Sequence, residues 1–318
     1  MELIRGIHNI RPYHSESTDG RIGTVLTIGA FDGLHSGHQV VLKHLCKSAK
    51  REGLPSLVVT LEPLPREYFS PLDAPPRLMS IREKYEGLAD LGIDRLLVIT
   101  FNDNLRNMEA VEFIKKVFVE GLRVKHIIVG DDFRFGKDGI GNFELLMRLG
   151  REYNFTVEDT ATIEQKDQRV SSTRIRKILE RADFSTAKKL LGKPYSISGK
   201  VIYGDQLGRD IGVPTANLEL HRLRAALSGV YAVNVKIDDI NVWLQGIANV
   251  GCRPTVNDSI KAILEVHILN FDKDIYGKRI TVRFLKKIRD EVKFESIEIL
   301  KSQIFKDIDM VNIYFGNV

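Results

Sequence analysis

This 318-residue chain has two cysteines, one tryptophan and no long apolar run. Cys46 and Cys252 lie far apart, and neither belongs to a Cys-x-x-Cys pair. This usage excludes a disulfide framework, argues against a zinc site and is typical of a reducing compartment. No apolar stretch reaches the roughly 18 residues that a membrane-spanning helix needs. The first six residues carry no apolar signal core, so we expect a cytoplasmic location and no membrane partner.

The chain also lacks a block of like charge. Its formal net charge is +5, but basic and acidic residues alternate along most of the predicted helices. The one dense basic segment, Lys286-Lys287-Ile288-Arg289, is equally typical of a solvated strand end. Because nucleic-acid interfaces concentrate positive charge on one face, we expect phosphate-bearing small ligands and no nucleic acid. A nucleic-acid-binding protein remains the alternative that rests on the net charge.

With 43% hydrophobic and 28% charged residues, the composition is that of a globular protein long enough for two domains. Strand and helix patterns alternate in the first half, which predicts an α/β domain with a parallel, doubly wound, Rossmann-like sheet. The expected strands are residues 24–28, 56–61, 95–100, 125–129 and 156–158. The expected helices are residues 38–52, 80–91, 108–120 and 142–153. Such sheets bind ligands at the carboxyl ends of their strands.

The pattern changes in the second half. A helical pattern over residues 172–191 ends at Gly192-Lys193-Pro194, which is typical of a helix stop. We place the domain boundary here, giving domains of residues 1–186 and 187–318. Six short β-rich runs then predict a small antiparallel β-barrel. These runs are residues 195–202, 213–218, 229–236, 242–249, 262–269 and 279–286. A helical pattern over residues 296–308 predicts a terminal helix.

The most informative segment joins the first predicted strand to the first helix. It reads Gly29-Ala30-Phe31-Asp32-Gly33-Leu34-His35-Ser36-Gly37-His38. Glycines let a backbone approach a ligand closely, and the helix start offers free N–H groups and a positive dipole end. His35 and His38 add imidazole donors, which suit phosphate oxygens that gain charge during a reaction. The alternative is two packing histidines beside a turn.

Two later segments of the first domain carry suitable chemistry. In Ser171-Ser172-Thr173-Arg174-Ile175-Arg176, hydroxyls at a helix start precede two arginines. This set can hold a polyphosphate, although an ordinary N-cap is an equally good interpretation. In Gly130-Asp131-Asp132-Phe133-Arg134-Phe135-Gly136, aromatic faces can cover a planar ring and Arg134 can meet a phosphate. Sequence alone favours a turn with core phenylalanines here.

The second domain has no Gly-x-x-x-x-Gly-Lys-Ser/Thr segment, which excludes a P-loop kinase. Glycines at 204, 208 and 212 instead precede Val213-Pro214-Thr215-Ala216-Asn217. Thr215 and Asn217 share a face if this segment is extended. Two neutral oxygens together with nucleotide phosphates suit Mg²⁺. A long hairpin loop leading into a strand with polar surface residues is the alternative.

Glu265 lies within the apolar strand pattern of residues 262–269. A carboxylate is costly to bury without partners. Glu265 therefore either lies on the wet face of its strand or acts as a general base. Periodicity alone favours the wet face.

Together these segments resemble the bacterial bifunctional riboflavin kinase/FAD synthetase (riboflavin kinase/FMN adenylyltransferase) family. The resemblance runs in order along nearly the whole chain. Further matching segments are Glu62-Pro63-x-Pro65, Gly229-Val230-Tyr231-Ala232, Asn249-x-Gly251-x-Arg253-Pro254-Thr255, Asp274-x-Tyr276-Gly277 and Arg289-Asp290-Glu291-x-Lys293-Phe294. The resemblance implies an FMN adenylyltransferase domain of the HxGH nucleotidyltransferase type, followed by a riboflavin kinase barrel.

The resemblance also implies residue roles. Catalytic roles fall to His35, His38 and Glu265. ATP contacts in the first domain fall to Gly29, Phe31, Asp32, His35, Gly37, His38, Ser172, Thr173 and Arg176. ATP contacts in the second domain fall to Gly204, Gly208, Arg209, Thr215 and Asn217, of which Thr215 and Asn217 also bind Mg²⁺. Flavin contacts fall to Asp132, Phe133, Arg134 and Arg289.

The implied substrates are ATP, riboflavin and FMN, with Mg²⁺ as cofactor, in a monomer or weak homo-oligomer. An alternative keeps the kinase and gives the first domain a weakened or regulatory role. It rests on Leu64, where family members often carry a polar residue, and on residues 137–142, which lack an arginine of the family's loop.

Overall fold

The computed structural model describes residues 1–11, 22–130, 133–160, 170–204, 208, 212–254 and 260–317. Contacts divide the chain into two units. Unit 1 comprises Met1–Pro75 and Ile81–Val170, and unit 2 comprises Pro76–Ser80 and Ser171–Val318. The division of function between residues 1–186 and 187–318 stays a prediction.

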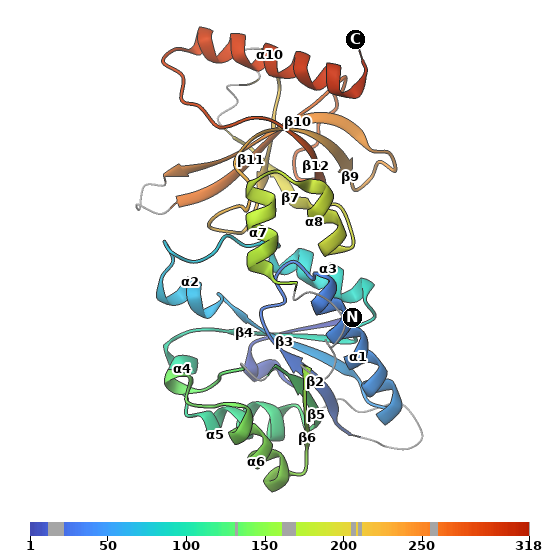
Figure 1. Ribbon diagram of the computed structural model, residues 1–318, viewed down its shortest axis with the longest axis vertical. Helices are drawn as coiled ribbons and strands as arrows, with labels where there is room; N and C mark the ends of the chain where they lie inside the picture. The colour runs from blue at the N-terminus through green and yellow to red at the C-terminus, as the bar shows by residue number, and fades with distance from the viewer. Residues whose placement is uncertain are drawn as a thin grey trace. The chain divides into compact units, whose positions relative to one another are not determined.

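Unit 1 is built on a six-stranded parallel sheet with the strand order β1-β4-β3-β2-β5-β6 (Figure 1). The strands are β1 (Glu2–Arg5), β2 (Thr24–Ile28), β3 (Ser56–Glu62), β4 (Arg95–Thr100), β5 (Val124–Val129) and β6 (Thr156–Asp159). The central strands are continuous apolar runs, as burial on both faces requires. The chain proceeds from β2 to β3 and β4 on one side and then to β5 on the other. The strand order therefore reverses beside β2, and the loops after β2 and β5 become neighbours.

The helices of unit 1 are α1 (Ser36–Glu52), α2 (Pro65–Phe69), α3 (Ile81–Asp90), α4 (Asp103–Arg106), α5 (Ala110–Phe113) and α6 (Phe143–Tyr153). The predicted helix over residues 108–120 is instead α5 followed by a π-helix, Ile114–Gly121. Sequence periodicity did not reveal α2 and α4, because four or five residues are too few to show a helical period.

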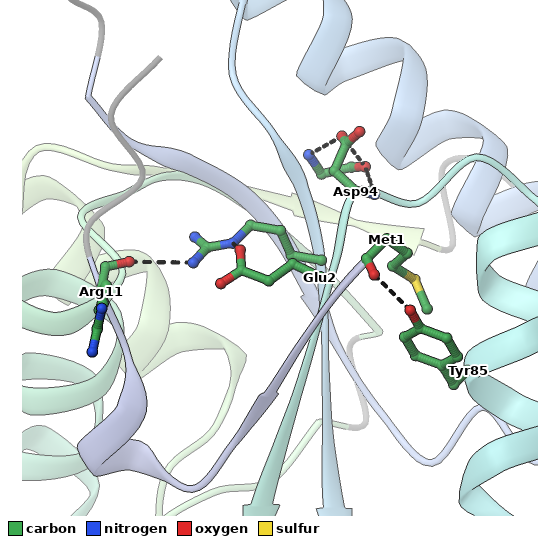
Figure 2. A network of polar contacts seen from close by, with 7 residues as sticks. Met1, Glu2, Arg11, Tyr85 and Asp94 are labelled. Atoms are coloured by element: carbon green, nitrogen blue, oxygen red, sulfur yellow. Dashed lines mark hydrogen bonds and ion pairs between the residues drawn. The ribbon is translucent and has the colours of Figure 1, made fainter. Parts of the chain in front are cut away.

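Strand β1, which the sequence pattern does not predict, is held at the sheet edge by polar contacts (Figure 2). Arg95 Nε donates to Glu2 Oε2 at 2.7 Å, and the Tyr85 hydroxyl donates to the Met1 carbonyl oxygen at 2.6 Å. Asp94 accepts from the backbone N–H of Ser56 at 2.8 Å and thereby ties the starts of β4 and β3 together. These partners are distant in sequence, so local patterns carry no signal of them.

Unit 2 is a closed barrel of antiparallel strands in the order β10-β11-β8-β7-β12-β9. The strands are β7 (Ser196–Ile202), β8 (Ala216–Glu219), β9 (Gly229–Ile237), β10 (Leu244–Pro254), β11 (Ile260–Ile268) and β12 (Arg279–Arg289). Burial alternates along β12, as expected for a strand with one face toward the barrel core. The predicted parallel sheet, antiparallel barrel and terminal helix are thus confirmed.

Three helices complete unit 2: α7 (Ser172–Glu180), α8 (Phe184–Leu191) and α10 (Ile297–Phe315). The single pattern over residues 172–191 divides in two, because Ala182 adopts a positive φ of 54° between α7 and α8. Helix α10 lies over the barrel (Figure 1), where Val311 packs with Val230, Ala232 and Ile247. Ile308 and Phe315 extend this contact at helical spacing. Within the described part of the chain, no helix is long and apolar enough to cross a membrane.

Candidate active sites

The histidine segment of unit 1 crosses from β2 to α1 at the point where the strand order reverses. His35 is the N-cap of α1, and its Nδ1 accepts from the backbone N–H of His38 at 3.3 Å. The two imidazoles stack with their centroids 3.6 Å apart. Phe31 packs edge-on against His38 at 5.1 Å. The chain brings the two histidines together as one paired group at a helix start.

Burial keeps both imidazoles neutral. It lowers the pKa of His35 from 6.5 to about 4, against an opposing effect of the Asp32 carboxylate. Burial, followed by the nearby His35 and Lys84, lowers the pKa of His38 well below 6.5. Because Nδ1 of His35 accepts a hydrogen bond, its single proton lies on Nε2. Nδ1 of His38 is buried and has no hydrogen-bond partner among the described residues, which is the kind of group that a bound ligand satisfies.

Lys84 is a cation near this pair that sequence reasoning missed. Lys84 lies on α3 and is only 3% exposed. Its Nζ donates to Thr60 Oγ1 of β3 at 3.2 Å. β3 pairs with β2 up to Ile28 and Val59, and the backbone N–H of Gly29 donates to the Val59 carbonyl. The ammonium therefore lies beside the strand ends from which the histidine loop starts. A lysine in a helical pattern gives no sign that it is buried.

A pocket of about 420 Å³ opens at the carboxyl edge of the same sheet. Aromatic rings dominate its lining, which is typical of sites for planar ligands. Those rings belong to Phe69, Phe101, Phe113, Phe133 and Phe135. Gly29 and Ala30 join the pocket to the histidine loop, and Leu64 lies on its wall.

Both phenylalanines of the loop after β5 line the pocket and also pack with the core. Phe135 is 6% exposed and stacks on the half-buried Phe133 with centroids 5.3 Å apart. Arg134 is exposed, lines the pocket and donates to the Phe133 carbonyl at 3.0 Å. Phe135 thus agrees with the interpretation as a core phenylalanine, whereas the flavin contacts of Phe133 and Arg134 stay predictions. Asp132 lies outside the described residues.

The predicted triphosphate contacts Ser172, Thr173 and Arg176 lie on α7, which belongs to unit 2 by its contacts. Ser171 caps the helix by accepting from the backbone N–H of Arg174 at 3.3 Å, so the N-cap interpretation holds for this residue. Arg176 Nε donates to the Pro76 carbonyl at 2.6 Å. The role of these three residues toward ATP stays a prediction.

In unit 2, strand register assembles the candidate kinase site. Asn217 of β8 pairs with Glu265 of β11, and Glu265 pairs with Asn249 of β10. The row continues through Val230 of β9 to Arg289 of β12. Directly paired residues project from the same face of a sheet, so these five side chains share one face. All five line a pocket of about 250 Å³, together with Thr215 and residues of α10.

Glycines form the other side of this site. A Cβ added at Gly204 would overlap the Asn217 side chain, and one added at Gly208 would lie 3.1 Å from Thr215 Oγ1. The backbone N–H of Val213 donates to the Gly208 carbonyl at 2.7 Å. The absence of Cβ atoms thus lets this backbone approach both predicted Mg²⁺ ligands. Arg209 lies outside the described residues.

Arg289, a predicted flavin contact, is fixed from α10. Its guanidinium binds the Asp307 carboxylate through Nε at 2.9 Å and Nη2 at 2.8 Å. Asp307 is only 2% exposed, and it also accepts from Gln303 Nε2 at 2.8 Å. The terminal helix therefore closes the pocket and orients the guanidinium on its wall.

A further pocket of about 360 Å³ adjoins the site, and Thr215 lines both pockets. Its lining includes Asp272, Asp274 and Tyr276. Tyr276 stacks on Tyr203 with centroids 4.0 Å apart. Thr215 therefore lies at the boundary between two adjacent cavities.

Comparison with known proteins finds a family match for each part of the chain. Residues 18–174 match the FAD synthetase family, and residues 191–315 match the riboflavin kinase family. The bifunctional riboflavin kinase/FMN adenylyltransferase of Pseudomonas fluorescens is 47% identical over 308 residues, covering 97% of this chain and 96% of the relative. The protein of the same description from Escherichia coli (strain K12) is 44% identical over 316 residues, covering 99% and 98%. The chain belongs to this bifunctional family.

A solved structure has a similar fold. The crystal structure described as a macrolide-efflux protein from Streptococcus pneumoniae matches with a TM-score of 0.70 and 29% sequence identity. The match covers 98% of the present chain and 99% of the chain in the crystal structure. The presence of both family domains in one chain favours the bifunctional prediction over a kinase with a weakened first domain.

Beyond Lys84, sequence reasoning missed several residues of the two sites in this member of the bifunctional family. In unit 1, Phe69, Phe101 and Arg106 line the pocket from segments that show no helix or strand period there. In unit 2, His267 and Asp307 line the kinase site. Asn249 belongs to a segment that matches the family, but only the strand register reveals that it lies beside Glu265.

Proposed function

We propose that the chain phosphorylates riboflavin to FMN in unit 2 and adenylylates FMN to FAD in unit 1, with ATP as the donor in both reactions. The main support for this proposal is the row of paired residues Asn217, Glu265 and Asn249. This row lies beside Thr215, which lines two adjacent pockets. It places a carboxylate, two amides and a hydroxyl together. That donor set suits phosphate transfer to an alcohol.

In the kinase step, Glu265 takes the proton from the ribityl 5′-hydroxyl while that oxygen attacks the γ-phosphorus of ATP. The bond from the γ-phosphorus to the β,γ-bridging oxygen breaks, and ADP leaves. The flavin occupies the 250 Å³ pocket, whose wall includes Val230, Ile247 and Arg289. The nucleotide occupies the adjoining pocket, so that its terminal phosphate reaches Thr215.

The residues present fit Mg²⁺ at the kinase site. Thr215 and Asn217 offer neutral oxygens, and glycines keep the space around both side chains free of Cβ atoms. Mg²⁺ retains several waters and needs few protein ligands when phosphates supply the rest. The ion supplies charge neutralisation for the transferring phosphate when bound.

In the adenylyl step, the FMN phosphate attacks the α-phosphorus of ATP in line, and pyrophosphate leaves. His35 and His38 donate N–H groups to the α-phosphate oxygens as these gain charge, helped by the free N–H groups at the start of α1. The isoalloxazine ring occupies the aromatic pocket, where Phe133 and Arg134 lie. Such a step depends on positioning and charge stabilisation rather than on covalent help.

The test is product analysis with the two flavins supplied separately. The purified chain receives either riboflavin or FMN, with ATP and Mg²⁺, and the flavins are then separated. We expect FMN and FAD from riboflavin, and FAD with pyrophosphate from FMN. Absence of both products would refute the proposal, and FMN formation without FAD from either flavin would revive the kinase-only alternative. A cytoplasmic location and a monomeric or weakly oligomeric state stay predictions.

A further inference from the structure

The ladder between β8 and β11 ends just before Thr215. Its pairs are Leu264 with Leu218, Glu265 with Asn217 and Val266 with Ala216. Thr215 therefore lies beyond the last paired residue, and Pro214 has no N–H with which to extend the ladder. Backbone pairing alone does not fix the position of Thr215 relative to Glu265.

Two hydrogen bonds hold this segment instead. The backbone N–H of Val213 donates to the Gly208 carbonyl at 2.7 Å. Nδ1 of His267 lies 2.8 Å from the Pro214 carbonyl oxygen. Because a carbonyl oxygen only accepts, Nδ1 carries the proton and donates. His267 directly follows Val266, the last residue of β11 that pairs with β8, so its side chain extends the contact between these two strands by one position.

We propose that His267 is a positioning residue of the kinase reaction, whose hydrogen bond to Pro214 sets Thr215 at the correct distance from Glu265. Glu265 and His267 lie two positions apart on β11, so they share a face, and both line the same pocket as Thr215. The imidazole thus connects the strand of the base to the segment of the phosphate ligand. This inference rests on the proposed role of Thr215 toward Mg²⁺–ATP.

The test compares three variants of the full chain. His267→Leu removes the donor, whereas His267→Asn keeps an amide N–H at nearly the position of Nδ1. His221→Asn is the matched control, because that histidine is 68% exposed, and neither His221 nor its partner Glu219 lines the candidate kinase pocket. The readouts are the KM for Mg²⁺–ATP, the KM for riboflavin and kcat. Calorimetric affinity for a non-hydrolysable ATP analogue is measured with and without Mg²⁺.

We expect His267→Leu to raise the KM for Mg²⁺–ATP and to weaken Mg²⁺-dependent analogue binding by roughly three- to tenfold, the contribution of one neutral hydrogen bond. The KM for riboflavin and the rate of FAD formation from FMN should not change. His267→Asn should recover most of the loss, and His221→Asn should match the parent chain. Unchanged FAD formation reports that unit 1 remains folded, and an unchanged KM for riboflavin reports the same of unit 2.

Thr215→Val distinguishes an error in the inference about His267 from an error in the proposed role of Thr215. If Thr215→Val weakens Mg²⁺–ATP binding at the kinase site but His267→Leu does not, the inference about His267 is wrong and the proposed site stands. If neither variant weakens binding, the proposed role of Thr215 is wrong. If His267→Leu also abolishes FAD formation, the Asn variant decides: a parent-like KM supports the inference, and a raised KM overturns it.

Discussion

At the scale of single residues, burial sets the charge of the groups at the proposed adenylyl site. His35 and His38 are neutral near pH 7 because their burial disfavours the imidazolium form. A neutral imidazole still donates one N–H, so the pair can bind phosphate oxygens through directed hydrogen bonds. Lys84, buried nearby, adds a cation whose charge contributes to the lowered pKa of His38. The site thus combines donors that keep their protonation state with one cation.

The lowered pKa of His35 makes folding stability depend on pH. In the unfolded chain this imidazole binds a proton below about 6.5, whereas in the folded chain it does so only below about 4. Stability is therefore complete above about pH 6.5 and falls as the pH drops from about 6.5 toward 4. At about 1.4 kcal/mol per pKa unit, the loss due to His35 is about 3 kcal/mol.

Denaturant unfolding of the parent chain and His35→Gln, measured across this pH range, checks the linkage. The variant should lose less stability on acidification than the parent chain, whereas His221→Asn, at an exposed histidine, should behave like the parent. Equal losses in the parent chain and in His35→Gln would contradict the argument.

Glu265 is the proposed general base of the kinase step. Glu265→Gln keeps the size and hydrogen-bonding capacity of the side chain but cannot accept the hydroxyl proton. We expect FMN formation to fall by about 10²- to 10⁴-fold, the usual contribution of a general base. FAD formation from FMN should remain at the parent rate. Glu219→Gln, on the neighbouring strand β8, is the control and should leave both rates unchanged.

At the scale of elements, a strand end or a helix cap creates each site. The turn from β2 into α1 makes His35 an N-cap and stacks it on His38. The register of four neighbouring strand pairs aligns Asn217, Glu265, Asn249, Val230 and Arg289. Helix α10 then covers this face and anchors Arg289 through Asp307. The kinase pocket therefore depends on the docking of the terminal helix.

Removing the clamp between α10 and β12 should destabilise unit 2. Arg289→Ala removes the guanidinium from the Asp307 carboxylate, which is 2% exposed, and leaves it the hydrogen bond from Gln303. Breaking a buried ion pair costs about 3–5 kcal/mol, and the partial exposure of Arg289 lowers our expectation to about 2–3 kcal/mol. Chemical denaturation measures this loss.

Lys287→Ala provides the comparison for this clamp. It removes a pair in which Asp290 is 87% exposed, and such a pair contributes about 0–1 kcal/mol. A loss for Arg289→Ala no larger than that for Lys287→Ala would show that the clamp contributes little.

At the scale of the whole molecule, two units with separate cores carry two separate sites. Among the residues that the structure describes, the lining of the pocket in unit 1 falls within residues 28–139, and the lining of the candidate kinase pocket falls within residues 208–307. Each of these pockets is thus lined from its own unit. This independence predicts that the two activities respond separately to substitution.

His38→Ala tests this separation. It removes one donor to the α-phosphate, so FAD formation from FMN should fall by about 10²- to 10³-fold, as for the loss of one transition-state donor. FMN formation from riboflavin should be unchanged, the mirror image of Glu265→Gln. Flavin products are measured in separate assays of the two steps. If both substitutions lowered both rates equally, the assignment of two sites would be wrong.

Sequence patterns predicted the long elements well, because a buried strand or an amphipathic helix repeats its apolar residues many times. They failed where an element is short or edge-bound, as for α2, α4 and β1. They also merged α7 and α8, since the helical period continues across Ala182 although its backbone does not. The site motifs were found where glycine, histidine or threonine stood at a distinctive spacing. No distinctive spacing in the sequence marked Lys84, His267 or Asp307.

The sequence alone determined the alternation of the first half, the β-rich second half and the residue types at each proposed phosphate-binding segment, because these depend on neighbours along the chain. Only the tertiary structure decided that Lys84 is buried, that Asn249 lies beside Glu265 and that Asp307 holds Arg289. The physical reason is that strand register, burial and ion pairing join residues that are distant in sequence. Their free energy arises only after the chain has closed on itself.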